Sequence, residues 1–544
     1  MRRIRLLLST CALLAAGPAP PVRFRDAADR AGLRFVLENS ATPEKRMIET
    51  MIGGVAAFDY NQDGRTDIFF TNGAAIPSMR KESPKYWNRL YRNEGGMKFT
   101  DVTREAGLAG EGYSMGAAAA DFDNDGLVDL FVAGVGGSRL YRNLGNGKFE
   151  DVTAKAGIHD DQWAVAAGWL DFDNDGRLDL WIVHYAQWPP ASDRFCGDSE
   201  KRIRIYCHPK YFQGLPNRLY RNLGGGKFED VSEASGVGRH AGRGMSVAFA
   251  DYDGDGFIDA FVTNDNEPNF LFRNLGNGKF EETGLAAGVA LLDSGKPVAS
   301  MGADFRDYDN DGWPDVSVTA LFGETYPLFR NTGKGGFRDA TYASRVGRAS
   351  ARISGWGNGL FDFNLDGWKD LFTANSHVND LVEQFEPTRY RLANSIFLNE
   401  NGSFRDGTAE AGQGFQAARA HRGAAFADFN GDGKIDVVVS ALGEAAELWE
   451  NISETDGEWL IVKLEGVWSN RDGIGARLRW GNQWNVMTSA VGYASSSHFG
   501  VHFGAPKGQA PDRLEIWWPG GKKQTVAGVK ARRIVVVRQQ EEDR

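Results

Sequence analysis

Short apolar runs separated by polar turns recur along most of the chain. One repeat reads as an apolar run such as SVAFA, an acidic turn, a second apolar run, and a hairpin stretch such as LYRNLGNGKF. Runs of this length, rich in Val, Phe, Ile and Tyr and bounded by Gly and Asn, predict short β-strands rather than helices. Each repeat accounts for about four strands. The pattern therefore predicts an all-β fold built from four-stranded units.

The acidic turn is the most regular part of the repeat. It has the form DxDxDGxxD and occurs seven times, at spacings between 50 and 80 residues. Units of this length that pack on their neighbours are typical of solenoids and propellers. We therefore expect a seven-bladed β-propeller over residues 22–455, with one blade for each acidic loop. The loops are numbered 1 to 7 by their first residues, which are Asp59, Asp121, Asp171, Asp251, Asp307, Asp362 and Asp428.

A second element, F-x-D, also occurs seven times but is offset from the acidic loops. Its first copy precedes loop 1, and loop 7 is followed by LWENISE without a further copy. This offset predicts that the strand near Phe24 completes the last blade and closes the ring, which hides the sheet edges. The copies start at Phe24, Phe99, Phe149, Phe228, Phe280, Phe337 and Phe404.

The residues of the acidic loop suit a hard cation. Positions 1, 3, 5 and 9 carry Asp or Asn, position 6 is Gly, and position 7 varies, as expected if only its backbone carbonyl is used. Oxygen ligands in a tight turn favour calcium, which takes about six to eight of them. We predict up to seven Ca²⁺ ions as cofactors. The predicted ligands are Asp59, Asn61, Asp63, Arg65 and Asp67; Asp121, Asp123, Asp125, Leu127 and Asp129; Asp171, Asp173, Asp175, Arg177 and Asp179; Asp251, Asp253, Asp255, Phe257 and Asp259; Asp307, Asp309, Asp311, Trp313 and Asp315; Asp362, Asn364, Asp366, Trp368 and Asp370; and Asp428, Asn430, Asp432, Lys434 and Asp436.

An EF-hand is the main competing interpretation of these loops. Its loop ends in a bidentate Glu at position 12 and is flanked by helices. No loop here has Glu at that position, and all but one have an apolar residue there. The chain is therefore expected to have entered a β-strand by position 12, with the Asp at position 9 as the last side-chain ligand. The residues at position 12 are Phe70, Val132, Ile182, Val262, Val318, Thr373 and Val439.

The N-terminus and the cysteines indicate the cellular compartment in which the protein resides. In residues 1–19, three arginines precede a short apolar run and small residues, which is the layout of a secretory signal. No later stretch approaches the roughly 20 apolar residues of a transmembrane helix. Export to an oxidising compartment predicts a disulfide between Cys196 and Cys207. We expect an exported protein, either extracellular or in the periplasm or cell envelope.

Residues 456–544 depart from the repeat. Their alternating apolar residues predict a small β domain, and the stretch NRDGIGA is followed by HFG and WPG motifs. Asn470, Arg471 and Asp472 stand before two glycines and are interpreted as a polar turn whose side chains hold the backbone. A ligand-binding use of the same three residues is the alternative.

Together these motifs resemble a known family. The acidic loops in their F-x-D frame resemble the FG-GAP (VCBS) repeats of integrin-α-like propellers, and the NRDGIGA, HFG and WPG motifs resemble the ASPIC/UnbV domain of cartilage acidic protein relatives. The resemblance implies a calcium-binding propeller followed by an ASPIC/UnbV-like domain, in a family of mostly extracellular proteins. Integrin-type propellers usually carry the acidic loop in only some blades, so seven copies are a departure.

The net charge limits the classes of partner that the protein can bind. The formal charge is −10; loss of three leader arginines would make it −13, and seven Ca²⁺ ions would add 14. A near-neutral loaded protein with an acidic apo form argues against a nucleic-acid partner. We expect an extracellular protein or a glycan as partner. The insertion at residues 184–216, which carries both cysteines, is the expected contact region because long loops on rigid scaffolds often bind.

No catalytic motif stands out in the sequence. The G-x-S-x-G match around Ser114 lies in the approach to an acidic loop, and the histidines show no paired metal-ligand spacing. We therefore expect a non-enzymatic scaffold for adhesion or ligand recognition. The alternative is a propeller enzyme, either a polysaccharide lyase or hydrolase or a quinone-dependent oxidoreductase. It would need a central pocket lined by clustered His, Arg, Lys or Tyr.

Overall fold

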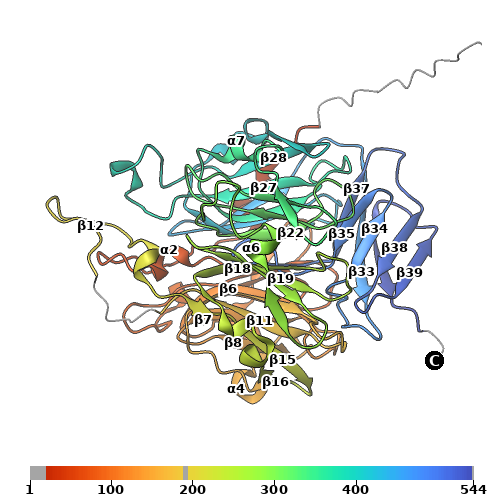
Figure 1. The fold of residues 1–544 in the computed structure, drawn as a ribbon, viewed down its shortest axis with the longest axis horizontal. Coiled ribbons are helices and arrows are strands. Elements are labelled where there is room, and N and C mark those ends of the chain that lie inside the picture. The colour runs from red at the N-terminus through yellow and green to blue at the C-terminus, as the bar shows by residue number, and fades with distance from the viewer. Residues whose placement is uncertain (1–19, 188–193, 542–544) are drawn as a thin grey trace, which may run out of the picture.

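The computed structural model describes residues 20–187 and 194–541. The expected leader, residues 1–19, lies outside the described residues and stays a prediction. Strands make up most of the regular structure, and the helices are about one turn long. Figure 1 shows the strands of the repeats stacked through the centre of the molecule and the C-terminal strands at one side. The predicted all-β propeller class is confirmed.

Each acidic loop joins the first and second strands of one antiparallel sheet. The first strands lie in the interior and are buried along their whole length, which explains their apolar and small residues. They are β2 (Val55–Phe58), β6 (Tyr113–Ala120), β10 (Ala164–Leu170), β18 (Gly244–Ala250), β22 (Ala303–Arg306), β26 (Gly355–Phe361) and β30 (His421–Ala427). The second strands are β3 (Asp67–Phe70), β7 (Asp129–Val135), β11 (Asp179–His184), β19 (Asp259–Asn264), β23 (Asp315–Val318), β27 (Asp370–Asn375) and β31 (Asp436–Ala441).

A hairpin adds the third and fourth strands to most of these sheets. Its turn is the Gly-rich stretch that the sequence pattern marked. The third strands are β4 (Arg89–Asn93), β8 (Arg139–Asn143), β15 (Arg218–Gly224), β20 (Phe270–Asn274), β24 (Leu328–Asn331), β28 (Ser395–Glu400) and β32 (Glu447–Asn451). Six of the fourth strands follow in the chain, namely β5 (Phe99–Asp101), β9 (Phe149–Asp151), β16 (Lys227–Asp230), β21 (Phe280–Glu282), β25 (Phe337–Asp339) and β29 (Ser403–Asp406).

The remaining fourth strand comes from the N-terminus. β1 (Phe24–Asp26) pairs antiparallel with β32, and Phe24 lies opposite Asn451. The first strands also contact one another in a closed cycle, from β2 through β6, β10, β18, β22 and β26 to β30 and back to β2. The predicted closure of the ring by the segment near Phe24 is confirmed.

Single helical turns follow the F-x-D strands. In one copy Asp101 accepts hydrogen bonds from the amide and hydroxyl of Thr103, and the turn ends at Gly107 with φ +76°, a conformation that favours glycine. The helices are α1 (Ala28–Ala31), α2 (Ile48–Met51), α3 (Thr103–Ala106), α4 (Thr153–Ala156), α5 (Ser232–Ser235), α6 (Gly284–Ala287) and α7 (Val346–Ser350). The 3₁₀ turns are Pro84–Tyr86, Pro209–Tyr211, Val237–Arg239, Val382–Gln384, Thr408–Glu410 and Gly414–Gln416. Among the described residues, none of the helices has the length and apolarity that crossing a membrane requires.

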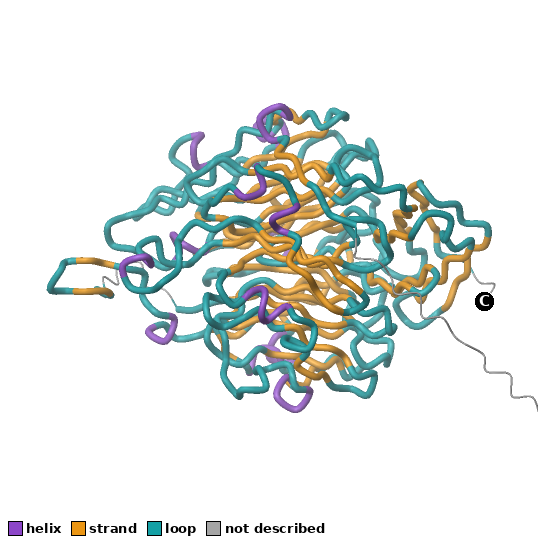
Figure 2. The backbone as a smooth tube through the Cα atoms, turned by 90° about the horizontal axis from the view of Figure 1, so that it is seen from above, coloured by secondary structure: helices purple, strands orange, loops and turns teal. Residues whose placement is uncertain are grey.

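The C-terminal region forms two further sheets beside the ring, seen at the right in Figures 1 and 2. One sheet has the order β37-β33-β40 and the other β35-β34-β38-β39. The strands are β33 (Glu458–Glu465), β34 (Arg477–Trp480), β35 (Gln483–Val486), β37 (Val501–Ala505), β38 (Arg513–Trp517), β39 (Lys523–Ala527) and β40 (Arg533–Arg538).

One C-terminal segment leaves these sheets and enters the centre of the ring. In this channel segment, residues 488–498, strand β36 (Ser496–His498) pairs parallel with β2. Ser495 Oγ accepts a hydrogen bond from the Val55 amide (3.2 Å), and Ser497 Oγ accepts one from the Phe426 amide (2.9 Å). The Gly492 amide also donates to the Ala303 carbonyl (2.9 Å) of β22, which lies across the ring from β2. The segment therefore lies in the channel, whereas its alternating pattern alone had suggested a strand of the small domain.

The insertion at residues 184–216 projects at the end of the molecule away from the C-terminal sheets, where Figure 1 marks β12. Its residues 188–193 lie outside the described residues. The predicted disulfide is confirmed: the Cα atoms of Cys196 and Cys207 lie 5.2 Å apart and their sulfurs are bonded. Short pairs of strands brace the region, namely β12 (Gly197–Asp198) with β13 (Ile203–Arg204), and β14 (Leu215–Pro216) with β17 (Ala241–Gly242).

Candidate metal centres in the acidic loops

The acidic loops all have the same setting between two strands. Position 9 is the first residue of the second strand in every loop, and position 12 lies within that strand. The strand environment predicted from the missing Glu is confirmed, and it excludes the helix-flanked geometry of an EF-hand.

The loop backbone is wrapped around its own carboxylates. In loop 2, Asp121 accepts hydrogen bonds from the amides of Asp125 (3.0 Å) and Gly126 (2.7 Å), and Asp125 accepts one from the Leu127 amide (2.9 Å). Gly126 has φ +90°, which explains the fixed Gly at position 6. The bond from the position 6 amide to the position 1 carboxylate recurs in all seven loops.

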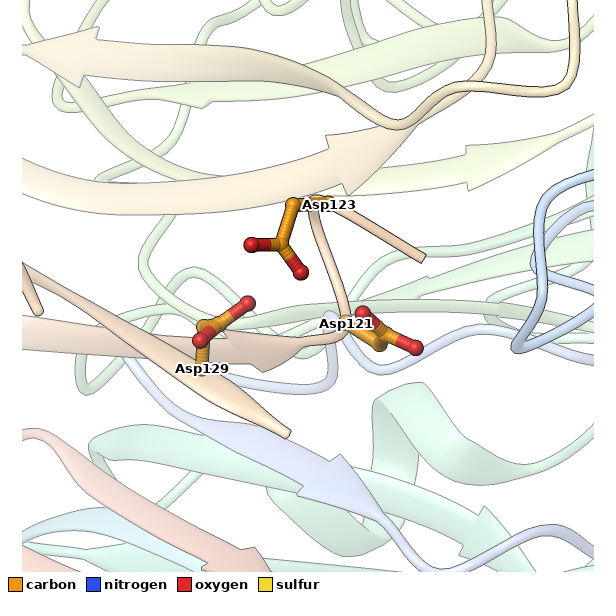
Figure 3. A group of neighbouring side chains, drawn as sticks. All are labelled: Asp121, Asp123 and Asp129. Carbon is orange, nitrogen blue, oxygen red and sulfur yellow. The ribbon is translucent and has the colours of Figure 1, made fainter. Parts of the chain in front are cut away.

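Four loops bring three carboxylates together. The candidate oxygen atoms within each group lie within 4.8 Å of one another. Figure 3 shows the group of loop 2, whose side chains gather where the chain passes from β6 to β7. Positions 1, 3 and 9 meet in loops 2 and 3, and positions 1, 3 and 5 meet in loops 4 and 5. The groups are Asp121, Asp123 and Asp129; Asp171, Asp173 and Asp179; Asp251, Asp253 and Asp255; and Asp307, Asp309 and Asp311.

The donor set of these groups fits a cation. Asp173 Oδ1 and Asp307 Oδ1 are buried and receive no hydrogen bond from the described residues. An unpartnered buried carboxylate oxygen is costly unless a positive charge compensates it. Carboxylate and carbonyl oxygens in a flexible turn are also the ligands that calcium prefers. The residues present therefore fit Ca²⁺.

Burial makes the negative charge of the loops unfavourable without such a cation. It raises the pKa of Asp67 to about 8 and that of Asp171 to about 7. Burial, followed by the charge of Asp472, raises the pKa of Asp121 to about 8. A bound divalent ion reverses this balance because it favours the ionised form of each carboxylate.

Loops 1, 6 and 7 differ because Asn replaces Asp at position 3, so they have one carboxylate fewer. In loops 1 and 6 the Asn amide nitrogen donates to the carboxylate at position 5, over 3.0 Å in both Asn61–Asp63 and Asn364–Asp366. In loop 7, Asn430 Oδ1 accepts a hydrogen bond from the Asp432 amide (2.9 Å). In these three loops the Asn at position 3 contacts position 5, and the loop carries one negative charge fewer.

An arginine accompanies each Asp-rich loop, a feature that the sequence interpretation missed. Arg142 contacts Asp123 (2.6 Å) and Asp125 (2.9 Å) of loop 2. The equivalent residue of loop 6 is Leu398 and that of loop 7 is Glu450, while Arg92 of loop 1 turns away to Glu94. In the sequence an Arg stands before an Asn in all four Asp-rich loops, and also in loop 1. The other Asp-rich loops pair in the same way with Arg221, Arg273 and Arg330.

The Asn that follows this arginine connects neighbouring sheets, and it was also missed. In loop 2 the Asn143 amide donates to Asp129 at position 9 (2.7 Å), and its side chain donates to the carbonyls of Val128 (3.0 Å) and Tyr60 (2.8 Å). Tyr60 belongs to the preceding loop, so each Asn ties one loop to the next. The equivalent residues are Asn93, Asn222, Asn274, Asn331, Asn399 and Asn451.

The polar turn of the C-terminal region docks on loop 2. Asn470 exchanges hydrogen bonds with the backbone of Ile474 (2.9 and 2.8 Å), as expected for a turn-holding side chain. Asp472 accepts from the Asp121 amide (2.8 Å) and pairs with the partly buried His498 (2.9 Å). The turn therefore also fixes the C-terminal sheets to a candidate metal loop.

Comparison with known families agrees with this architecture. Residues 59–132, 121–182, 211–262, 251–318, 307–373 and 362–439 match the FG-GAP-like repeat, which together covers more than half of the chain. The chain belongs to the FG-GAP-like repeat family. Residues 466–544 match the ASPIC and UnbV family. The resemblance inferred from the motifs is confirmed for both parts of this FG-GAP protein.

Curated relatives support the same assignment. The chain is 26% identical over 310 residues to mouse cartilage acidic protein 1 and 25% identical over 309 residues to the human protein. Each match covers 54% of this chain but only 44% and 43% of those relatives, so the aligned part is less than half their length.

Solved structures give more distant matches. One is an Agrocybe aegerita lectin described as recognising non-reducing terminal N-acetylglucosamine, with a TM-score of 0.41 and 15% identity over 73% of this chain and 87% of the lectin. Another is YCF48 bound to D1 peptide, with a TM-score of 0.42 and 8% identity over 81% of this chain and 99% of that one. Similarity at this level carries no argument about binding.

Proposed function

We propose that this FG-GAP protein is an exported calcium-binding scaffold, with ions held in up to seven acidic loops. The observation that carries the proposal is the repeated loop geometry with buried carboxylate oxygens that lack a donor, such as Asp173 Oδ1 and Asp307 Oδ1. The ligands would be the side chains at positions 1, 3, 5 and 9 and the carbonyl at position 7. A bound ion would supply positive charge at these Oδ1 atoms, which the arginine beside each loop does not contact.

The loops would make calcium part of the fold. Asp129 joins two strand ends, because its carboxylate accepts the amides of Phe122 (3.2 Å) and Asn143 (2.7 Å). Asn143 in turn bonds the preceding loop at Tyr60. An ion that favours ionised Asp129 would therefore strengthen contacts both within one sheet and between two sheets.

Chelation tests the proposal directly. The chain without residues 1–19 is compared in excess Ca²⁺, in excess Mg²⁺ and after removal of metal by EDTA. We expect chelation to lower Tm by about 10 °C or more, because ions bound only by the folded state stabilise it. Mg²⁺ should restore little of the loss, since it accepts an irregular oxygen cage poorly. Equal melting with and without chelator would refute a structural role for the metal.

Export and recognition form the second part of the proposal. Export is supported by the signal-like residues 1–19, by the disulfide of Cys196 and Cys207, and by relatives named cartilage acidic protein. The exported protein would consist of a propeller at 22–455 and a β domain at 456–544. The partner would be an extracellular protein or glycan bound through the insertion at 184–216. Fractionation and N-terminal sequencing of the mature chain test export; a cytoplasmic, uncleaved chain would contradict it.

A propeller enzyme is the second candidate, because one observation favours it. A pocket at the central axis is lined in part by Tyr206, His208 and His377, the residue types that the alternative requires. The channel segment fills the ring on the other side of this pocket, so a polysaccharide could not thread through the channel. Release of reducing ends from candidate polysaccharides, or reduction of a quinone analogue, would establish this function, and loss of that activity in His377→Ala would place it in the pocket.

A further inference from the structure

The face opposite the acidic loops contains a pocket of about 330 Å³ at the axis of the ring. It lies where the first strands begin, and Met245 and Trp356 belong to two of those strands. Met47 and Met51 from around α2 and Met301 before β22 complete an apolar wall. Pockets of this size hold small organic molecules. Nothing in the acidic-loop function uses this space.

The pocket is closed on two sides by segments that come from elsewhere in the chain. Tyr493 of the channel segment packs edge-on against Trp356, with 4.9 Å between ring centroids, and its hydroxyl donates to the Met51 carbonyl. On the other side Tyr206 and Cys207 of the disulfide-bonded insertion are almost fully buried. The disulfide therefore pins one wall of a preformed cavity.

Carboxylates supply the only formal charges of the described lining. Asp265 is 8% exposed and accepts a hydrogen bond from the Tyr185 hydroxyl (2.8 Å). Glu324 accepts two backbone amides at Oε2, from Ala299 (3.0 Å) and Leu321 (3.1 Å). Its Oε1 makes no hydrogen bond with the described residues, and exposed Glu386 stands at the rim. No Lys or Arg lines this pocket among the described residues.

Two histidines present hydrogen-bond donors rather than charges. Nδ1 of His377 accepts the Asn379 amide (3.0 Å), and Nδ1 of His208 accepts the Lys210 amide (3.1 Å). The neutral rings therefore carry their proton on Nε2. Burial lowers the pKa of His377 to about 4, which keeps this ring neutral near pH 7. His377 is 5% exposed, and its Nε2 has no partner among the described residues.

We propose that this axial pocket binds a small organic cation, whose ammonium group pairs with Glu324 and Asp265 and whose apolar body packs on the methionine and tryptophan wall. The carboxylates provide charge complementarity, and burial would strengthen the pairing by excluding water. The Nε2–H of His377 offers a donor for one oxygen of the ligand. This site is independent of the calcium loops. It shares the insertion at 184–216 with the extracellular partner proposed above, because Tyr206 and Cys207 line the pocket.

The proposal is tested with 2-phenylethylammonium as the probe. The control ligands are 2-phenylethanol, which is neutral, and phenylacetate, which is anionic. Binding to the calcium-loaded chain is measured by saturation-transfer NMR and calorimetry. We expect the ammonium to bind at least about tenfold more tightly than either control ligand, because only it can pair with Glu324. Equal binding of all three, a preference for phenylacetate, or no binding of the ammonium up to about 10 mM would overturn the proposal.

Variants locate the binding site. Glu324→Gln should weaken the ammonium by about tenfold and leave 2-phenylethanol unchanged, since the substitution removes charge but little volume. Glu281→Gln, on the exposed side of β21, is the matched control and should bind as the parent does. Both variants are first checked for the melting temperature of the parent in excess Ca²⁺. A well-folded Glu324→Gln variant with unchanged ammonium affinity would refute the assignment.

Discussion

The two faces of the ring differ in how much they repeat. On the acidic-loop face, each sheet joins its first two strands by a link of eight residues, positions 1 to 8 of the acidic loop. On the opposite face, the link between second and third strands ranges from residues 136–138 in one sheet to residues 185–217 in another. A cation site needs several oxygens at fixed positions, so the first face tolerates little change. The second face holds the insertion, α2 and the axial pocket, and its links can vary because only their ends are fixed.

The largest loss of stability is expected when the strand that closes the ring is removed. Deletion of residues 20–35 removes β1 and leaves the outer edge of β32 unpaired. It also exposes the partners of Phe24, which stacks on Phe415 at 5.2 Å. We expect Tm to fall by about 10 °C or more, because a buried strand and its aromatic contacts are lost. Deletion of residues 1–19 alone is the control and should leave melting unchanged. A ring that melts normally without β1 would show that closure does not depend on it.

The next largest effect is expected when the hydrogen bonds that join neighbouring acidic loops are removed. Asn143→Ala removes the side-chain hydrogen bonds to Tyr60 and Val128 and leaves two buried carbonyls without that donor. The free energy of unfolding should fall by about 2–3 kcal/mol, as measured by urea denaturation in excess Ca²⁺. Asn146→Ala, at an exposed position of the same hairpin, should change it by less than about 0.5 kcal/mol. Similar effects for the two variants would mean that Asn143 does not hold the loops together.

These cases also show what the sequence could predict. The loops, the four-stranded units and the closing role of Phe24 followed from the repeats, since each copy reports on the others. The disulfide followed from the presence of Cys196 and Cys207, 11 residues apart, in a chain expected to reach an oxidising compartment. The channel segment did not, because its contacts with Val55 and Phe426 join residues far apart in the chain. Its run of small residues, which suits a narrow channel, was the only local sign.

The candidate site was predictable to the same degree. Positions 1, 3, 5 and 9 could be chosen because they recur, and in four loops the structure brings three of these four positions together. The roles of Arg142 and Asn143 were overlooked because both stand outside the acidic loop in sequence. The axial pocket could not be predicted, since Asp265, Glu324 and His377 come from three different irregular links.

Converting an Asp-rich loop into an Asn-containing one tests how the two kinds of loop differ in calcium affinity. Asp123→Asn removes one carboxylate from loop 2 and leaves Arg142 with Asp125 alone. Calcium affinity at this loop should fall about tenfold, or about 1.4 kcal/mol, because a ligand charge is lost and a cation stays beside the ion. Adding Arg142→Leu, the combination found in loop 6, should recover most of that loss. Calorimetry of both variants measures the coupling, and additive losses would mean that Arg142 does not balance Asp123.

The smallest effect is expected where the opposite face is free to vary. A Gly-Ser-Gly insertion after Glu200 lengthens the exposed turn between β12 and β13, whose ends are already held by strand pairing and the disulfide. The free energy of unfolding should change by less than about 0.5 kcal/mol, since loop length enters closure entropy only logarithmically. The same insertion after Asp125 displaces the amides of Gly126 and Leu127 from their carboxylates and should abolish calcium binding at loop 2. If both insertions proved equally mild in denaturation and calcium titration, the acidic face would owe its regularity to ancestry rather than to the demands of a bound ion.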